Sequence, residues 1–136
     1  MDLKLLIIVN PVASKIKRYM KSRGKIIAEF KKKYKVVDEV FTKYRFHAKK
    51  LISQYKSKYD LIVLAGGDGL INESLPALVK KNIKISFLPT GGANVLSKQV
   101  KFPHKLEKIA ARICSGKIHN VNIGKANNDY FILMFE

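Results

Sequence analysis

The chain has 136 residues, with 27 Lys and Arg against 10 Asp and Glu, so its formal net charge is +17. This length suits a single globular domain, and the 47% hydrophobic content excludes an intrinsically disordered chain. The single cysteine, Cys114, excludes a disulfide framework and a cysteine-based zinc site. Since no apolar run approaches the roughly 18 residues of a membrane span, we expect a cytoplasmic protein. Its cationic surface suits three kinds of partner: nucleic acid, an anionic membrane or a polyphosphate ligand.

The apolar pattern alternates between strand-sized runs and helical periods, which is typical of an α/β domain. It predicts strands over residues 3–9, 35–41, 60–65 and 83–88, and two more over 117–123 and 129–135 around a turn at 127–129. Helices are expected over 15–33, 46–58, 70–81 and 94–98, and from Pro103 to a stop at Gly116. Gly24 is a candidate break in the first helix, whose expected inward side chains are Ile16, Tyr19, Met20, Ile26, Ile27 and Phe30.

Two glycine-rich loops follow consecutive predicted strands, at residues 66–69 and 91–92. At the carboxyl end of a parallel sheet, such loops let backbone N–H groups approach a phosphate, and the next helix adds positive potential. Asp68 in the first loop could orient a water, a metal ion or a substrate hydroxyl. The simpler alternative is a pair of tight strand-to-helix turns with no ligand.

Several known phosphate and metal signatures are absent. No P-loop and no protein-kinase signature occurs, and Asn72 stands where the dinucleotide-binding fingerprint needs a third glycine. The three histidines lack metal-ligand spacing, so we expect no protein metal site built on His47, His104 and His119.

Residues 66–73 read Gly-Gly-Asp-Gly-Leu-Ile-Asn-Glu, which closely resembles the GGDGTxNE motif of the diacylglycerol kinase catalytic domain family. That family includes bacterial lipid kinases and sphingosine kinases. Asn10-Pro11 after the first strand resembles the family's opening loop, and Thr42 resembles its threonine position. Residues 89–94, Pro-Thr-Gly-Gly-Ala-Asn, resemble its P-x-G-T-x-N loop. NAD kinases share GGDG without the adjoining Asn-Glu, so the resemblance favours the lipid-kinase branch.

The resemblance implies that residues 1–136 form an N-terminal, NAD-kinase-like ATP-binding domain, with a three-layer α/β/α fold and a mostly parallel sheet. It also implies ATP and Mg²⁺ as cofactors and transfer of the γ-phosphate to a lipid hydroxyl, diacylglycerol by default, in phospholipid biosynthesis. The family's second domain, a β-sandwich, is absent from this chain, so we expect the fragment alone to be inactive. The apolar run over 130–135 is consistent with a chain cut where that domain begins; a docked terminal strand is the alternative.

The resemblance also assigns roles to residues. Asp68 is the expected catalytic residue, and the expected nucleotide site comprises Asn10, Pro11, Thr42, Gly66, Gly67, Asp68, Gly69, Asn72, Glu73, Gly91, Gly92 and Asn94. Simpler roles exist for Glu73, as a first-turn acid, and for Asn94, as a helix cap. Leu70 and Gly92 stand where the family has threonine, which predicts weaker ATP binding or divergence.

Other interpretations remain open. The chain could be a non-catalytic nucleotide-binding or regulatory module, or an enzyme similar to NAD kinases. Nucleic-acid binding rests on charge alone and is the least favoured. For a lipid kinase we expect peripheral membrane docking through Lys31, Lys32, Lys33, Lys35, Lys49 and Lys50. A homodimer is also kept as an alternative to a monomer.

Overall fold

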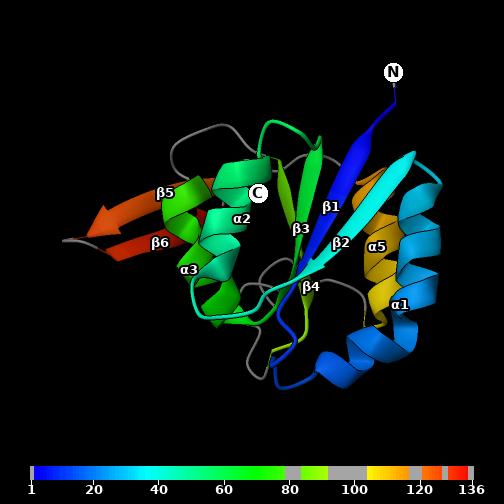
Figure 1. Cartoon of the computed structure of the whole chain (residues 1–136), viewed down its shortest axis with the longest axis horizontal. Helices are drawn as coiled ribbons and strands as arrows, with labels where there is room; N and C mark the ends of the chain where they lie inside the picture. Colours follow the sequence, from blue (N-terminus) through cyan, green and yellow to red (C-terminus); the bar gives the residue numbers. More distant parts are fainter. Residues whose placement is uncertain (1, 79–83, 92–103, 117–120, 127–128, 135–136) are drawn as a thin grey trace.

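The computed structural model describes residues 2–78, 84–91, 104–116, 121–126 and 129–134. Its centre is a parallel sheet of four strands, β1 (Lys4–Val9), β2 (Val36–Phe41), β3 (Leu61–Gly66) and β4 (Ile85–Pro89), in the order β2-β1-β3-β4. Helices α1 (Ile16–Lys31) and α5 (Leu106–Ser115) cover one face, and α2 (His47–Tyr55) and α3 (Asp68–Leu78) cover the other (Figure 1). The predicted three-layer α/β/α fold is therefore confirmed.

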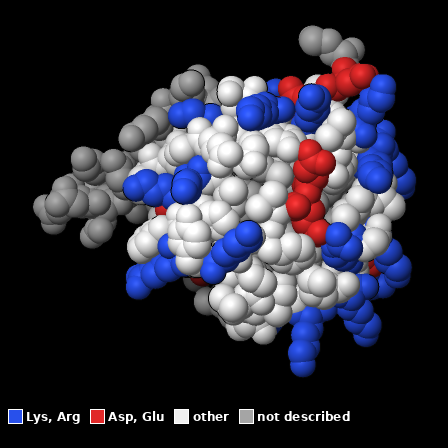
Figure 2. All heavy atoms as spheres, in the orientation of Figure 1, with Lys and Arg blue, Asp and Glu red and all other residues white. Residues whose placement is uncertain are grey.

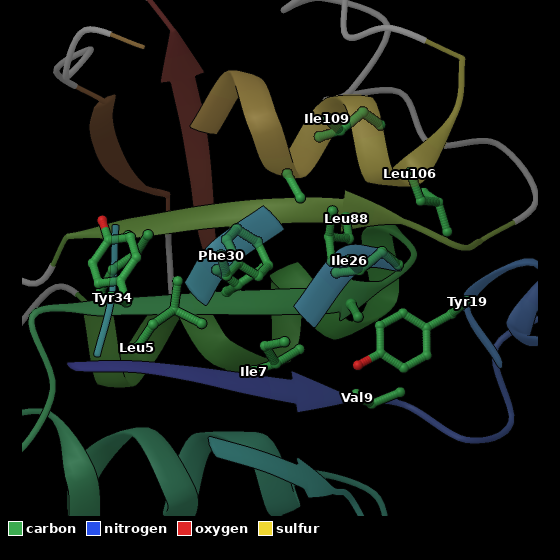
Figure 3. Packing of buried hydrophobic residues seen from close by; sticks show 14 residues of the cluster. Leu5, Ile7, Val9, Tyr19, Ile26, Phe30, Tyr34, Leu88, Leu106 and Ile109 are labelled. Carbon is green, nitrogen blue, oxygen red and sulfur yellow. The ribbon is translucent and has the colours of Figure 1, made fainter. Parts of the chain in front are cut away.

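The central strands β1 and β3 are apolar at every position after the exposed Lys4 because both of their faces are covered. Along β1, Leu5, Ile7 and Val9 pack toward α1 and α5, as Figure 3 shows, whereas Leu6 and Ile8 pack toward α2 and α3. Side chains of β3 alternate in the same way between the two clusters. This period of two places one buried cluster on each side of the sheet.

Helix α1 runs through Gly24 without a break, so the proposed interruption there is wrong. It is held by buried Tyr19, Ile26 and Phe30, which offset the roughly 1 kcal/mol that a glycine costs in a helix. Met20 is 50% exposed, contrary to the prediction, because Tyr19 already occupies the inward position and successive residues point about 100° apart.

The edge strand β2 is tied to α1 by a polar cluster. The Tyr19 hydroxyl donates to the Glu39 carboxylate, and Arg23 Nε donates to its two oxygens at 2.7 and 2.8 Å. Burial and then this bond raise the pKa of Tyr19, and the bond to Glu39 raises the pKa of Arg23. The phenol therefore stays neutral and the guanidinium stays charged, and together they pin β2 to the helix.

Some boundaries differ from the predicted ones. Helix α2 ends at Tyr55 rather than 58, and α5 begins at Leu106. The last two strands, β5 (Val121–Ala126) and β6 (Asp129–Met134), form an antiparallel hairpin whose first strand continues to Ala126, beyond the predicted end at 123. Residues 117–120 of its predicted start lie outside the described residues. β6 lies beside α3 (Figure 1). The helix predicted over 94–98, the end of the one predicted to reach 81, Pro103 and part of the turn at 127–129 lie outside the described residues.

Candidate functional site

The strand order places a topological switch point, called the crevice below, between β1 and β3. The chain leaves β1 into α1 on one face of the sheet and leaves β3 into α3 on the opposite face, although the two strands are neighbours. In open parallel sheets, ligands bind where neighbouring connections diverge in this way, beyond the carboxyl ends of the strands. Asn10 and Gly67, the residues that follow β1 and β3, lie at this point.

Backbone hydrogen bonds join the loops at this edge. They run from Asn10 N–H to the Ala65 carbonyl (2.9 Å), Thr42 N–H to Val9 (2.8 Å), Thr90 N–H to Gly66 (2.9 Å) and Lys15 N–H to Thr90 (2.8 Å). The residues that follow all four strands therefore meet at one end of the sheet, as the sequence motifs predicted. In Figure 1 it is the lower end, where the blue segment after β1 and the teal segment after β2 leave the sheet.

The glycine turn is tighter than the predicted loop of residues 66–69. Gly66 is the last residue of β3 and α3 already begins at Asp68, so Gly67 alone connects them. A Cβ on Gly67 would lie 2.8 Å from the Gly91 Cα, whereas a Cβ on Gly69 would meet nothing within 4 Å. The two glycine-rich segments are therefore in backbone contact, and no described atom lies within 4 Å of a Cβ placed on Gly69 in the first turn of α3.

Position 70 serves the core rather than the crevice. Leu70 is 3% exposed and belongs to the cluster between the sheet and helices α2 and α3. Its Cδ2 would lie 2.6 Å from a Cβ on Gly66, so the side chain closes the strand-to-helix junction from inside. The threonine hydroxyl that the resemblance expects at this position has no counterpart here.

Thr90 offers a hydroxyl nearby. It is fully buried at the end of β4, and its Oγ1 is the buried side-chain atom that has no hydrogen-bond partner in the described parts of the chain. Buried hydroxyls are usually paired, with protein, water or ligand. The sequence places Thr90 in the Pro-Thr-Gly-Gly-Ala-Asn segment as a possible substitute for the missing threonine hydroxyls, but its burial and lack of a partner cannot be read from the motif.

The remaining predicted residues are distributed as follows. Asn10 Oδ1 accepts the Val12 N–H at 3.1 Å, which closes a turn around exposed Pro11, and Thr42 is buried. Asn72 is exposed on α3. Gly91 is buried, whereas Gly92 and Asn94 lie outside the described residues.

Glu73 has a partner that the sequence did not indicate. Its carboxylate accepts the backbone N–H of Phe46 at 2.7 Å, so it ties α3 to the segment before α2 rather than to the glycine turn. Phe46 has a φ of 68°, which is uncommon for a residue with a side chain. No local sequence pattern predicts such a bond, because its partners are 27 residues apart in the chain.

Charge at this edge is mixed, with Lys15 and Lys43 in the loops and Asp68 at the start of α3. In the described part of the chain, no group of three His, Cys, Asp or Glu side chains gathers to hold a metal ion. Within those same residues, none of the helices combines the length and the apolar character needed to span a membrane.

The family model of the diacylglycerol kinase catalytic domain matches residues 4–126. The chain belongs to this family. The match extends from β1 to the end of β5, so the diacylglycerol kinase catalytic domain includes all of the loops that meet at the crevice.

Relatives agree with this assignment. A diacylglycerol kinase from Staphylococcus epidermidis is 34% identical over 79 residues, which are 57% of this chain and 25% of that protein. One from Staphylococcus aureus is 34% identical over 76 residues, covering 54% of this chain and 24% of its own length. The crystal structure of a diacylglycerol kinase from Bacillus anthracis matches 94% of this chain and 47% of its own, with a TM-score of 0.79 and 28% identity. This diacylglycerol kinase domain thus spans less than half the length of these relatives.

Proposed function

We propose that the domain binds ATP at the crevice and is the nucleotide-binding half of a kinase that phosphorylates the hydroxyl of a diacylglycerol-like lipid. The observation that carries the proposal is the backbone contact of Gly67 with Gly91 beside the open first turn of α3. Two glycine segments in contact leave room for phosphates where side chains would fill it, and a helix N-terminus favours their negative charge.

Each predicted site residue has a role in this proposal. The backbone N–H groups of the first turn of α3, from Asp68 onward, and the Thr90 hydroxyl would hold phosphate oxygens. The turn at Asn10 and Pro11 and the side chain of Thr42 would border the nucleotide. Gly67, Gly69 and Gly91 would keep the approach free of side chains, and Gly66 makes room for Leu70. Asn72 would support the turn from α3, and Glu73 would hold the segment before α2. Gly92 and Asn94 are carried over by resemblance alone.

Magnesium fits the donor set at this edge. Mg²⁺ usually takes one or two protein carboxylates and completes its shell with phosphate oxygens and water. Asp68, at the start of α3, would supply such a carboxylate or orient the acceptor hydroxyl. The metal would neutralise phosphate charge during transfer, while the protein groups position the reactants.

A pair of matched variants tests ATP binding. Gly69→Ala and Gly24→Ala each add a methyl group to a helical glycine, and in both cases the new Cβ would meet nothing within 4 Å. If phosphates lie over the first turn of α3, Gly69→Ala blocks them and lowers ATP affinity at least tenfold, whereas Gly24→Ala leaves it unchanged. Isothermal titration calorimetry with ATP measures both. Equal affinities in the two variants would contradict the proposed phosphate position.

Transfer to lipid needs a separate assay. The natural protein that contains this domain is given radiolabelled ATP, Mg²⁺ and a panel of lipids, with NAD as a competing acceptor. We expect labelled phosphate on a diacylglycerol-like lipid, and a loss of at least 100-fold in rate for Asp68→Asn with little change in melting temperature. No labelled lipid would reject the lipid-kinase proposal, and labelled NAD would favour the NAD-kinase alternative.

One observation favours a second candidate, a non-catalytic nucleotide-binding module. Leu70 fills the core where the family has a threonine, so one expected polar contact to the nucleotide is missing. Calorimetric ATP binding without phosphate transfer to any acceptor would support this candidate.

We also propose a cytoplasmic protein that reaches its lipid at a membrane surface. The expected docking lysines, however, do not all lie at the same edge of the sheet. Lys31, Lys32, Lys33 and Lys35 precede β2, at the amino-terminal edge of the sheet, whereas the crevice lies at the carboxyl-terminal edge. The six residues of β2 separate those edges by about 20 Å. Three of these lysines also have partners, since Lys32 pairs with Glu29, Lys35 with Asp2, and Lys33 donates to the Cys114 carbonyl.

A further inference from the structure

The segment between β2 and α2 exposes an unusual set of side chains. Lys43, Tyr44, Arg45 and Phe46, here called the 43–46 loop, alternate between cationic and aromatic residues. All four are exposed, and the two rings remain 54% and 51% accessible to solvent. Tyr44 and Phe46 are therefore among the few large apolar side chains outside the two buried clusters of the described chain.

The loop is held in this exposed form by specific bonds. The Lys43 N–H donates to His47 Nδ1 at 2.9 Å, and the Tyr44 ring stacks on His47 with 4.4 Å between ring centroids. The Phe46 N–H donates to Glu73 at 2.7 Å, which supports its φ of 68°. Left-handed backbone at a bulky residue persists only where surrounding contacts hold it.

The loop borders the crevice. Thr42, immediately before it, donates its N–H to Val9 at the end of β1. Glu73, which holds Phe46, lies five residues after Asp68 on α3, or about 7.5 Å along the helix axis. Lipid that enters the crevice from this edge would therefore pass beside the exposed rings.

We propose that the 43–46 loop docks the protein on an anionic lipid bilayer. The inference rests on the proposed function, because a lipid acceptor must be taken from a membrane at the same edge as the nucleotide site. Aromatic rings settle at the level of lipid headgroups, where one side is apolar and the other is wet. Lys43 and Arg45 pair with anionic headgroups on either side of the rings, and Arg45 already lies 5.0 Å above the Phe46 ring. Glu73 acts as a positioning residue through Phe46.

Charge complementarity selects the bilayer as the occupant. Figure 2 shows Lys and Arg spread over the visible face, with acidic side chains gathered mainly in one column and near the N-terminus. The chain as a whole carries +17, so an anionic surface attracts it from a distance before the rings make contact.

Vesicle co-sedimentation with paired variants tests the loop. The vesicles contain phosphatidylcholine with about one-third phosphatidylglycerol, and neutral phosphatidylcholine vesicles are the reference. Lys43→Gln with Arg45→Gln should lower the partition coefficient roughly 25-fold, because each cation near the leaflet strengthens binding about fivefold. The matched pair Lys31→Gln with Lys32→Gln removes the same charge from exposed positions at the opposite edge of the sheet and should lower it less than about threefold.

The rings are tested in the same way. Tyr44→Ser with Phe46→Asn removes both rings, and asparagine tolerates the left-handed backbone at position 46. Binding should fall at least tenfold, whereas Met20→Ser, which removes a half-exposed side chain from α1, should leave it unchanged. Circular dichroism and melting temperature confirm that each variant is folded. Glu73→Gln keeps an acceptor for the Phe46 N–H and should bind vesicles more strongly than Glu73→Ala.

A fluorescent probe reports contact directly, because the chain contains no tryptophan. Phe46→Trp should shift its emission to the blue and be quenched by brominated lipids when anionic vesicles are added. Met20→Trp on α1 should do neither.

The outcomes separate the two proposals. Docking through the loop would be overturned if the two charge-pair variants lost equal amounts of vesicle binding, or if Phe46→Trp bound vesicles without a shift in its emission. Either result would mean that binding depends on the overall charge of the protein. A fall in ATP affinity for Phe46→Asn without a fall in vesicle binding would overturn it in favour of a nucleotide contact. None of these measurements requires catalysis, and the calorimetric ATP titration requires no vesicles. The docking inference and the proposed function can therefore fail independently.

Discussion

Thr90 illustrates how one buried side chain can serve a ligand. Its hydroxyl lies fully buried without a partner among the described residues, and an unpaired buried hydroxyl costs about 1–3 kcal/mol. A bound water or a phosphate oxygen would remove that cost. The hydroxyl lies one residue before Gly91, which touches the glycine turn, so a ligand at the crevice is within its reach.

Thr90→Val tests this role because valine keeps the shape of threonine and removes its hydroxyl. Without ATP, we expect the free energy of unfolding to rise by about 1–3 kcal/mol because the unpaired hydroxyl is removed, and we expect ATP affinity to fall about five- to tenfold. Urea unfolding and calorimetry measure the two quantities. Ser74→Ala is the matched control, because the Ser74 hydroxyl is buried and already donates to the Leu70 carbonyl at 2.7 Å. Ser74→Ala should lower stability by about 1 kcal/mol and leave ATP affinity unchanged. If Thr90→Val bound ATP as tightly as the parent does, Thr90 would be a packing residue only.

At the scale of elements, α1 shows how packing overrides local propensity. Gly24 weakens the helix locally, but the buried faces of Tyr19, Ile26 and Phe30 hold both halves against the sheet and α5 (Figure 3). Helix stability in proteins comes mainly from such packing of one face.

Gly24→Ala should therefore raise the free energy of unfolding by about 0.5–1 kcal/mol, because alanine loses less backbone entropy and its Cβ meets nothing within 4 Å. Urea unfolding measures the change. A destabilised Gly24→Ala protein would mean that the helix is interrupted at this position in solution.

The junction between α2 and β3 is expected to weaken at alkaline pH. The Tyr59 hydroxyl donates to the Asp38 carboxylate on β2 at 2.6 Å, and burial together with this bond raises the pKa of Tyr59 from 10.0 to about 12. The folded protein thus favours the neutral phenol. Its contribution to stability is complete below pH 10 and is lost as the pH rises toward 12.

We expect the melting temperature to fall between pH 10 and pH 12, and to fall less steeply in Tyr59→Phe, which has no phenol to ionise. Tyr44→Phe is the control, because Tyr44 is exposed and has no bonded carboxylate among the described contacts. If the melting temperatures of Tyr59→Phe and the parent fell in parallel with rising pH, ionisation of Tyr59 would not contribute to alkaline unfolding.

At the scale of the whole molecule, the net charge of +17 acts on every anionic ligand. The charges surround the sheet, so their combined field attracts ATP and vesicles alike and weakens with salt. The field does not single out one site; in the proposed function, the glycine contact and the N-terminus of α3 select the crevice.

Raising the salt concentration from about 0.05 to 0.3 M should therefore weaken ATP binding about five- to tenfold and adenosine binding hardly at all, since adenosine carries no phosphate. Calorimetry with both ligands measures the difference. Equal salt dependence of the two would mean that the phosphates lie outside the positive field.

Much of this architecture follows from local pattern. Continuous apolar runs identify β1 and β3, helical periods identify the covering helices, and the motifs after β1, β2, β3 and β4 identify the edge where the loops meet. These features could be predicted because the spacing of apolar residues along the chain differs between buried strands and amphipathic helices. The resemblance to the diacylglycerol kinase family rests on the same short segments.

The sequence by itself therefore determined the fold class, the family and the edge of the sheet at which the candidate site lies. Only the tertiary structure decided that α3 begins at Asp68, that Gly67 touches Gly91 and that Glu73 holds Phe46. It also assigned the lysines of 31–35 to the edge away from the crevice and the 43–46 loop to the edge beside it. The physical reason is that these contacts join residues far apart in the chain, whose distances are set by strand order and by packing across the sheet rather than by local periodicity.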